Sequence, residues 1–252
     1  MTTKHLSAPT LEEFVALWER KAATRVVYED FYDRLAAECR PGRTIEIGGG
    51  IGNLKQRLGD VVSTDIQFAP WLECVADAQR MPFATGSATN IVMVDVLHHL
   101  EFPAAFFREA IRVLQPGGRV LMVEPAMTWG SRWICKYFHY EPMVMSADSL
   151  ADGTPDPERS PYDSNQAIAT ILATRDRARF HAKFPALRMT RVHWFGFVAY
   201  PASGGFKPWS LLSGEAARRV LRLERFIERP LGRIAGFKMM IVIEKAVTAS
   251  RV

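Results

Sequence analysis

The sequence predicts an α/β protein in which a mostly parallel β-sheet is covered by helices on both faces. In the first half of the chain, short and almost continuous apolar runs alternate with amphipathic segments, which is the pattern of strands buried on both faces. Several of these runs end at an acidic residue, and the first is followed by a cluster of glycines. The composition, with 48% hydrophobic and 23% charged residues, excludes a disordered or low-complexity chain.

The predicted elements follow this alternation in order. Apolar residues at three- and four-residue steps predict a helix over residues 10–38, and Pro41 with Gly42 ends it. The elements that follow are strands at 44–47, 61–64, 74–76, 91–94 and 119–123, and helices at 54–58 and 104–114. The Pro-Gly-Gly sequence at 116–118 is expected to end the second of these helices before the fifth strand.

The regular alternation stops after Pro125, where an aromatic segment is followed by one rich in Pro, Asp and Ser. Such a stretch predicts an inserted segment over residues 126–163. Asp163 and Gln166 resemble a helix-capping pair. The remaining predicted elements are a helix at about 165–180, a strand at 187–200, a Gly-rich loop at 201–208, a charged helix at 215–228 and a strand at 237–245.

We therefore expect a single domain over residues 1–252. It would begin with a helical segment at 10–40, and the segment 126–163 would be a lid on the acceptor side. A loop and a basic helix, at 201–232, would separate the last two strands.

The first predicted strand leads into a glycine-rich turn. Glu46 precedes Gly48, Gly50 and Gly52. Positions without a side chain let a ligand lie directly on the backbone, and the predicted helix after them offers free N–H groups to an anion. The alternative is an ordinary strand-to-helix turn.

Acidic residues also end the next two predicted strands. Ligands in an open α/β sheet bind beyond the carboxyl ends of its strands, and an acid at the second of these can accept both hydroxyls of a ribose. Asp65 occupies that position, and Asp77 with Ala78 follows the third strand, where they could meet the edge of an adenine ring. Either acid could instead be a surface residue of an ordinary loop.

Two histidines follow the fourth predicted strand. Asp95 and Val96 end it, and His98 and His99 come directly after. Histidine is the usual general base near neutral pH, although either ring could simply bind backbone. Metal ligands on one helix face are spaced four residues apart, and the chain has no CxxC pair, so no metal site is predicted.

Taken together, residues 43–125 resemble the class I S-adenosylmethionine-dependent methyltransferases, in particular the small-molecule branch called type 11. The resemblance depends on five segments that occur in family order. They are the acidic-x-Gly-x-Gly-x-Gly turn from Glu46, the acidic strand end at Asp65, the Asp-Ala-x-x-x-Pro-Phe loop from Asp77, Leu-His-His at 97–99, and Leu-x-Pro-Gly-Gly at 114–118.

The resemblance implies a Rossmann-like, seven-stranded sheet of order 3-2-1-4-5-7-6, in which the last strand is antiparallel, with insertions after strand five and between strands six and seven. It also implies how S-adenosylmethionine would be bound. Glu46 and the glycines would surround its amino-acid part, and Asp65 would bind the ribose. Asp77 and the backbone of Ala78 would read adenine, and Asp95 and Val96 would lie beside the methyl group.

The function that this resemblance implies is in-line transfer of a methyl group, which leaves S-adenosylhomocysteine. The acceptor does not follow from the resemblance. We expect a small molecule, a lipid-linked molecule or a glycoconjugate, and favour O-methylation, for which His98 or His99 would be the base. One alternative is a nicotinamide- or flavin-dependent oxidoreductase, but Gly-x-Gly-x-x-Gly would place a glycine where Asn53 stands. The other is a non-catalytic module that binds S-adenosylmethionine.

Two patches outside the motif region favour a peripheral enzyme. If the segment after 126 is helical, one stripe is aromatic and a neighbouring row is basic, formed by Trp129, Trp133 and Tyr137 and by Arg132, Lys136 and Tyr140. Four arginines share one face of the charged helix, namely Arg218, Arg222, Arg225 and Arg229. The alternatives are core packing for the first patch and a solvated face for the second, whereas contact with an anionic membrane would use both.

Charge, cysteine content and apolar runs indicate the expected partners and cellular location. The net charge of +5 permits acidic partners, but no zinc-finger or RNA-binding motif indicates a specific nucleic acid. Three scattered cysteines are a poor disulfide framework, and no run of 18 apolar residues or secretory leader is evident. We expect a cytoplasmic protein that could also lie at the inner membrane surface, and no oligomeric state is predicted.

Overall fold

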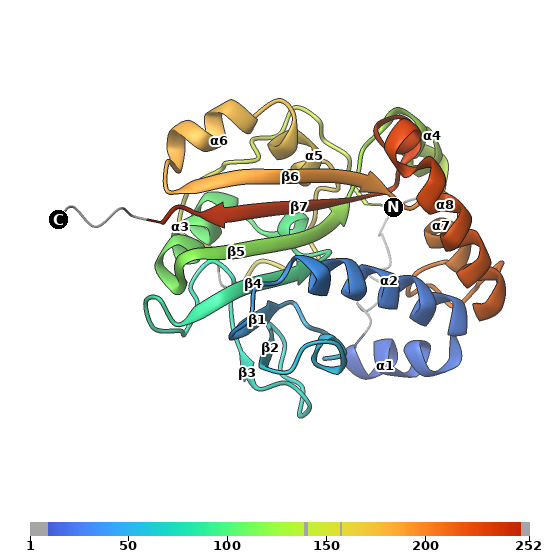
Figure 1. Ribbon diagram of the computed structural model, residues 1–252, viewed down its shortest axis with the longest axis horizontal. Helices are drawn as coiled ribbons and strands as arrows, with labels where there is room; N and C mark the ends of the chain where they lie inside the picture. Colours follow the sequence, from blue (N-terminus) through green and yellow to red (C-terminus); the bar gives the residue numbers. More distant parts are fainter. Residues whose placement is uncertain (1–9, 139–140, 157, 248–252) are drawn as a thin grey trace.

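The fold is a seven-stranded sheet between two layers of helices (Figure 1). A computed structural model describes residues 10–138, 141–156 and 158–247, without the side chains of 135–138. The sheet order is β3-β2-β1-β4-β5-β7-β6. Its strands are β1 (Thr44–Ile47), β2 (Val61–Asp65), β3 (Cys74–Val75), β4 (Ala88–Val94), β5 (Leu114–Pro125), β6 (Leu187–Phe195) and β7 (Lys238–Lys245).

The pairing confirms the predicted fold class. Strands β1 to β5 pair in parallel, whereas β7 runs antiparallel to both β5 and β6. The chain order reverses direction between β1 and β4, which is where open α/β sheets bind ligands beyond their strand ends. The fold therefore gives one edge of the sheet the geometry of a binding site.

Both faces of the sheet are buried. Alternate residues of β5 point to opposite faces, so Leu121 packs under one helical layer and Met122 under the other. The first layer contains α2 (Ala22–Glu38) and α8 (Gly214–Ala235), and the second contains α3 (Pro103–Val113), α5 (Ile168–Ala173) and α6 (Arg177–Lys183). This double burial explains why the strands read as continuous apolar runs.

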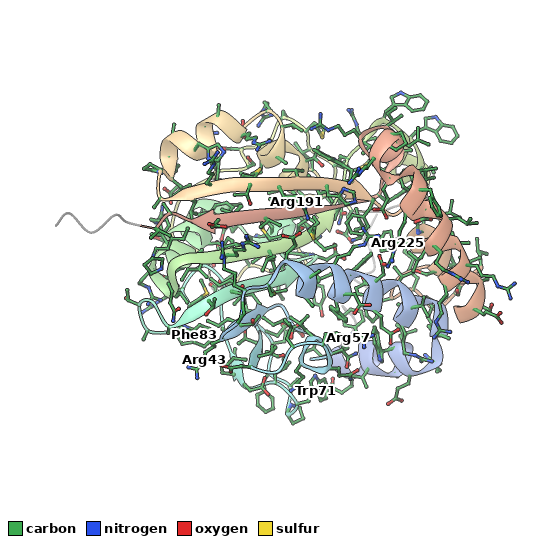
Figure 2. The ribbon with its side chains drawn as sticks, in the orientation of Figure 1. Arg43, Arg57, Trp71, Phe83, Arg191 and Arg225 are labelled. Carbon is green, nitrogen blue, oxygen red and sulfur yellow. The ribbon has the colours of Figure 1, made fainter. Side chains whose placement is uncertain are left out.

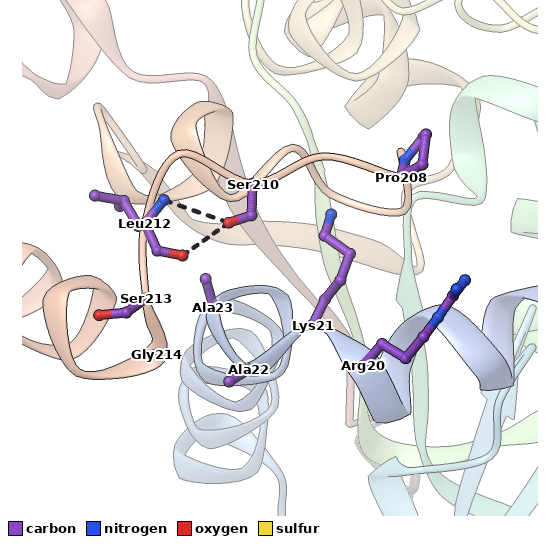
Figure 3. Close-up of a pocket in the computed structure, with 9 residues that line it drawn as sticks. All are labelled: Arg20, Lys21, Ala22, Ala23, Pro208, Ser210, Leu212, Ser213 and Gly214. Carbon is purple, nitrogen blue, oxygen red and sulfur yellow. Dashed lines mark hydrogen bonds between the residues drawn. The ribbon is translucent and has the colours of Figure 1, made fainter.

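The predicted N-terminal helix is two helices. α1 (Leu11–Arg20) and α2 are separated by Lys21, whose amine donates to the carbonyls of Gly205 and Lys207. A pocket lies at this break, between the start of α2 and the loop before α8 (Figure 3). The prediction of one helix was wrong because this contact spans more than 180 residues of sequence and leaves no local periodic signal.

Other predicted boundaries need correction. After the glycines only a short 3-10 turn, η1 (Leu54–Gln56), forms instead of a helix, because Leu54 alone is buried there and β2 begins soon after. The segment 115–118 belongs to β5 rather than to a helix stop. The strand predicted to reach 200 ends at Phe195, and α7 (Ala199–Ser203) follows it. The helix predicted at 215–228 extends as α8 through Pro230 to Ala235.

The helix predicted at 165–180 is likewise divided. α5 and α6 are separated at Thr174–Asp176, where Asp176 accepts from Arg175 and from the hydroxyl of Ser149. The predicted capping role of Gln166 was wrong, since its side chain donates to Glu141 instead. The segment after β5 begins with a further helix, α4 (Trp129–Phe138), which the sequence indicated only as a condition for its two stripes. The side chains of Lys136, Tyr137 and Tyr140 in those stripes lie outside the described part of the chain.

Candidate functional site

The carboxyl ends of the parallel strands bring four acidic side chains to one edge of the sheet. Glu46 lies on β1, Asp65 ends β2, Asp95 follows β4, and Glu124 lies near the end of β5. All of them except Asp95 are at most 8% exposed. Burying several carboxylates in one region is costly unless each has partners, so their contacts define what the site can do.

The glycine-rich turn lies directly against this edge. Gly48 has φ +67°, and a Cβ there would lie 2.3 Å from Cγ2 of Val96, so no side chain fits between the two loops. Gly50 has φ +48°, and its added Cβ would meet no atom within 4 Å. The turn is therefore closed on the side of Val96 and open at Gly50, as a cradle for a ligand requires.

Asp65 is held by the same turn. One carboxylate oxygen accepts the N–H of Gly50 at 3.0 Å, and the other accepts the N–H of Gln67 at 3.0 Å. Burial raises the pKa of Asp65, while these backbone N–H groups oppose the shift. A carboxylate has about four acceptor positions, so about two remain for hydroxyls of a ligand. These open positions fit the ribose expected at this residue.

Glu46 lies beneath the turn rather than in its open part. Its carboxylate accepts the hydroxyl of Ser63 at 2.5 Å, and a Cβ on Gly49 would lie 2.9 Å from Oε2. Burial raises the pKa of Glu46 to about 7. Glu46 thus supports the glycine backbone from inside, and its charge changes near neutral pH.

The loop after β3 is more exposed. Asp77 accepts the N–H of Gln79 at 2.8 Å, and Ala78 is buried. Part of the inserted segment reaches the neighbouring loop, because the side-chain amide of Gln67 donates to the hydroxyl of Tyr162 at 2.9 Å. The segment after β5 therefore extends over the side of the site formed by β2.

Asp95 has a buried partner that the sequence did not reveal. The amine of Lys238, at the start of β7, lies 2.5 and 2.7 Å from the two carboxylate oxygens and is 1% exposed. Burial would lower the pKa of Lys238, but Asp95 outweighs it and holds that pKa above its usual value. Asp95 also has φ 57°, the single positive value among the described residues other than glycine. The pair fixes a strained backbone beside the site.

The two histidines differ in their contacts. Nδ1 of His98 lies 2.7 Å from Oε2 of Glu124, whose other oxygen accepts the N–H groups of Val96 and Leu97. Burial lowers the pKa of His98, but Glu124 more than offsets it and the net shift is upward. Nε2 of His98 points away from Glu124 and lies 4.0 Å from a carboxylate oxygen of Glu141. Glu124 therefore fixes which nitrogen of His98 remains available.

His99 lies beside His98, with the ring centroids 4.2 Å apart. Burial, together with the neighbouring His98, lowers the pKa of His99 to about 4. Its buried Nδ1 has no hydrogen-bond partner among the described residues. His98, His99 and Glu141 each offer one atom within 4.8 Å of the others, so this trio could hold a metal ion.

Sequence reasoning placed the acids and histidines near one another but missed three of their partners. Glu124 could have been found, because it ends a predicted strand as the other acids do. Lys238 begins an apolar strand 143 residues from Asp95, and Glu141 lies in an irregular segment, so neither carries a local signal.

Comparison with known proteins gives one family match. Residues 45–122 match a family model described as a methyltransferase domain. No curated protein matches the chain. One similar solved structure is an S-adenosylmethionine-dependent methyltransferase from Thermotoga maritima, at 16% identity and a TM-score of 0.55, covering 93% of this chain and 98% of that one. This likeness supports the fold.

Two further structures are similar at lower scores. A methyltransferase from Archaeoglobus fulgidus shares 14% identity with a TM-score of 0.49, over 92% of this chain and 99% of that one. Geranyl diphosphate C-methyltransferase from Streptomyces coelicolor A3(2) shares 13% identity with a TM-score of 0.46, over 87% of this chain and 76% of that one.

The Asp95–Lys238 pair gives a prediction about stability. Removing one partner of a buried ion pair leaves an unpaired charge and costs about 3–5 kcal/mol. We expect Lys238→Met to lower the free energy of unfolding by about 3 kcal/mol, measured by urea denaturation, and much of this loss to be recovered in the Lys238→Met, Asp95→Asn double variant. Arg43→Met, which removes an exposed pair with Asp60, should change stability by less than about 1 kcal/mol. Similar small effects for Lys238 and Arg43 would contradict the assignment.

Proposed function

Because the chain is a class I S-adenosylmethionine-dependent methyltransferase of the type 11 branch, with S-adenosylmethionine as its cofactor, we propose that it methylates a hydroxyl group. The observation that carries the proposal is the Glu124–His98 pair, which lies next to the strand end expected to face the methyl group. Methyl transfer to a hydroxyl group needs a base at this place, whereas a module that only binds S-adenosylmethionine does not. The oxidoreductase alternative lacks the glycine that its motif requires at Asn53.

The cofactor contacts that we propose follow the strand ends. The open turn at Gly48, Gly50 and Gly52 would take the amino-acid part, with Glu46 as its acidic neighbour. Asp65 would accept the ribose hydroxyls at the positions that its backbone donors leave free. Adenine would lie against Asp77 and Ala78, and the methyl group would lie beside Asp95 and Val96.

We propose roles for the residues around the methyl group. When bound, S-adenosylmethionine supplies a methyl carbon attached to a positively charged sulfur. Nε2 of His98 would take the proton of the acceptor hydroxyl, and Glu124 would hold the ring in the required tautomer. Asp95 is bound to Lys238 by both oxygens and would position the loop rather than act as the base. His99, with its low pKa, would remain neutral beside His98 and contact the acceptor without receiving its proton.

The acceptor class that we propose is a lipid-linked small molecule or glycoconjugate, reached at the inner membrane surface. None of the described helices is long and apolar enough to cross a bilayer. Support for this class comes from exposed tryptophans on α4 and from the arginine-rich helix α8, since both lie at the end of the molecule that carries the site (Figure 1). A screen of labelled methyl transfer into lipid, saccharide, nucleic-acid and metabolite fractions of a cell extract would identify it.

The ribose contact gives a prediction about cofactor affinity. Hydrogen bonds to a charged group contribute about 1.5–3 kcal/mol each, so losing two should weaken binding by roughly a hundredfold or more. We expect this for Asp65→Ala, measured by calorimetry with S-adenosylmethionine, while circular dichroism shows the fold to be intact. Asp60→Ala, in the exposed loop before β2, is the matched control and should bind normally. Unchanged affinity in Asp65→Ala would contradict the assignment.

The proposed base gives a prediction about rate and pH. His98→Gln should lower kcat by about 10²–10⁴-fold in the labelled-transfer assay. The base must be neutral, so activity should rise as pH rises through the pKa of His98. Because Glu124 raises that pKa, Glu124→Gln should move the acidic limb of the pH profile to lower pH. His181→Gln, on α6, is the control and should leave the rate and the profile unchanged.

A chelator distinguishes this mechanism from the alternative in which the same residues bind a metal ion. If His98 acts as the base, activity should be insensitive to EDTA. Loss of activity in EDTA and recovery with a divalent cation would assign His98, His99 and Glu141 to a metal and would contradict the proposed role of His98.

A further inference from the structure

Helix α8 has an exposed face of unusual composition. After Glu215, every exposed residue of this helix is an arginine, a large apolar residue or Pro230. Phe226 is 83% exposed and Leu223 is 67% exposed. The apolar members are Leu223, Phe226, Ile227, Leu231 and Ile234, and the arginines are Arg218, Arg219, Arg222, Arg225, Arg229 and Arg233. Glu215, which pairs with Arg219 in the first turns, is the single exposed acid among the described residues of this helix.

The two acidic residues farther along α8, Glu224 and Glu228, point inward. Glu224 is 3% exposed and accepts the N–H groups of Phe197, Val198 and Ala199. Glu228 pairs with Arg34 of α2 and with His193 of β6. These contacts fix the rotation of α8 on the body of the protein. The apolar and arginine side therefore faces outward as a property of the fold.

At 3.6 residues per turn, the exposed residues divide into two flanks. The apolar side chains lie on one flank and most of the arginines on the other. Arg225 marks the arginine flank, where it reaches Asp30 of α2 (Figure 2). Phe226 and Leu223 meet three arginines, Arg219, Arg222 and Arg225, in a shallow hollow.

Helix α4 adds two tryptophans to the same surface. Its Gly130 packs against the end of α8, where an added Cβ would lie 3.1 Å from Cα of Ala235. Trp129 is 79% exposed and Trp133 is 62% exposed. α4 and α8 lie side by side at one end of the molecule (Figure 1). Two segments that are about 90 residues apart in sequence thus form one surface, which we call the α4/α8 surface.

This surface adjoins the candidate active site. α4 begins four residues after Pro125, in the strand that carries Glu124, and α8 ends three residues before Lys238. A molecule held at the α4/α8 surface would lie next to the strand ends where the acceptor is expected.

We propose that the α4/α8 surface binds an anionic lipid bilayer. Large apolar and aromatic side chains insert to the depth of the headgroups, while the flanking arginines contact lipid phosphates, as in helices that lie in the interface plane. A second copy of this chain is a poor occupant, because a self-complementary interface would bring the arginine flanks together. The link from this surface to a lipid-linked acceptor rests on the proposed function.

The test is co-sedimentation with vesicles of phosphatidylcholine alone and of phosphatidylcholine with about one-third phosphatidylglycerol. We expect binding to the anionic vesicles, weak binding to the neutral ones, and release near 1 M salt, where charges are screened beyond about 3 Å. Each arginine near an anionic surface raises the partition coefficient onto the membrane about fivefold. Replacing two of them, in Arg222→Gln with Arg229→Gln, should therefore lower that coefficient roughly 25-fold. Phe226→Ser should weaken it roughly tenfold or more.

Control variants remove two arginines or one exposed apolar side chain at positions outside the α4/α8 surface. Arg43→Gln with Arg188→Gln lowers the net charge equally, and Val247→Ser replaces another exposed apolar side chain, 72% exposed. Both should bind vesicles as the wild type does. Absence of binding to anionic vesicles, or equal losses in the matched variants, would overturn the proposal. A dimer that Phe226→Ser dissociates, without vesicle binding, would assign the surface to a second copy and would overturn it as well.

Affinity for S-adenosylmethionine, measured by calorimetry on the same proteins, separates this proposal from the proposed function. The α4/α8 variants should retain that affinity. Vesicle binding without cofactor binding would contradict the methyltransferase site alone, and cofactor binding without vesicle binding would contradict the surface alone.

Discussion

The structure depends on keeping several carboxylates satisfied at the carboxyl edge of one sheet. An uncompensated buried charge costs several kcal/mol, and the fold compensates each acid differently. Ser63 donates to Glu46, backbone N–H groups donate to Asp65 and Glu124, and Lys238 pairs with Asp95. Because these donors come from strands and loops that the sheet topology brings together, the same contacts that stabilise the fold also set the shape of the site.

The C-terminal part of the chain links the candidate site to an exposed surface of the protein. Glu224 and Glu228 hold α8 against β6, α7 and α2, and the chain then enters β7 at Lys238. Buried acids thus orient a helix whose outer side is apolar and basic. The segment after β5 contributes α4 to the outer surface and Glu141 and Tyr162 to the site. Both segments lie outside residues 45–122, which match the methyltransferase domain model.

The parallel strands and the placement of Asp65, Asp95 and the histidines could be predicted from sequence, because apolar periodicity and strand-end residues are local signals. The order of the strands followed only from the family resemblance. The break at Lys21 could not, since a distant loop supplies the carbonyls that hold its amine. The Lys238 partner of Asp95 was missed for the same reason. The exposed apolar flank of α8 was also missed, because the sequence drew attention only to four arginines on one face of the helix. Only the packing of Glu224 and Glu228 shows which side faces out. The roles assigned to the individual site residues remain predictions.

A crystal structure with S-adenosylhomocysteine tests the central claim most directly. The account predicts that the ribose hydroxyls lie within hydrogen-bonding distance of Asp65, with the amino-acid part over Gly50 and the sulfur facing the loop of Asp95 and His98. Density for the compound at another part of the molecule, or none at saturating concentration, would contradict the claim that these strand ends form its binding site.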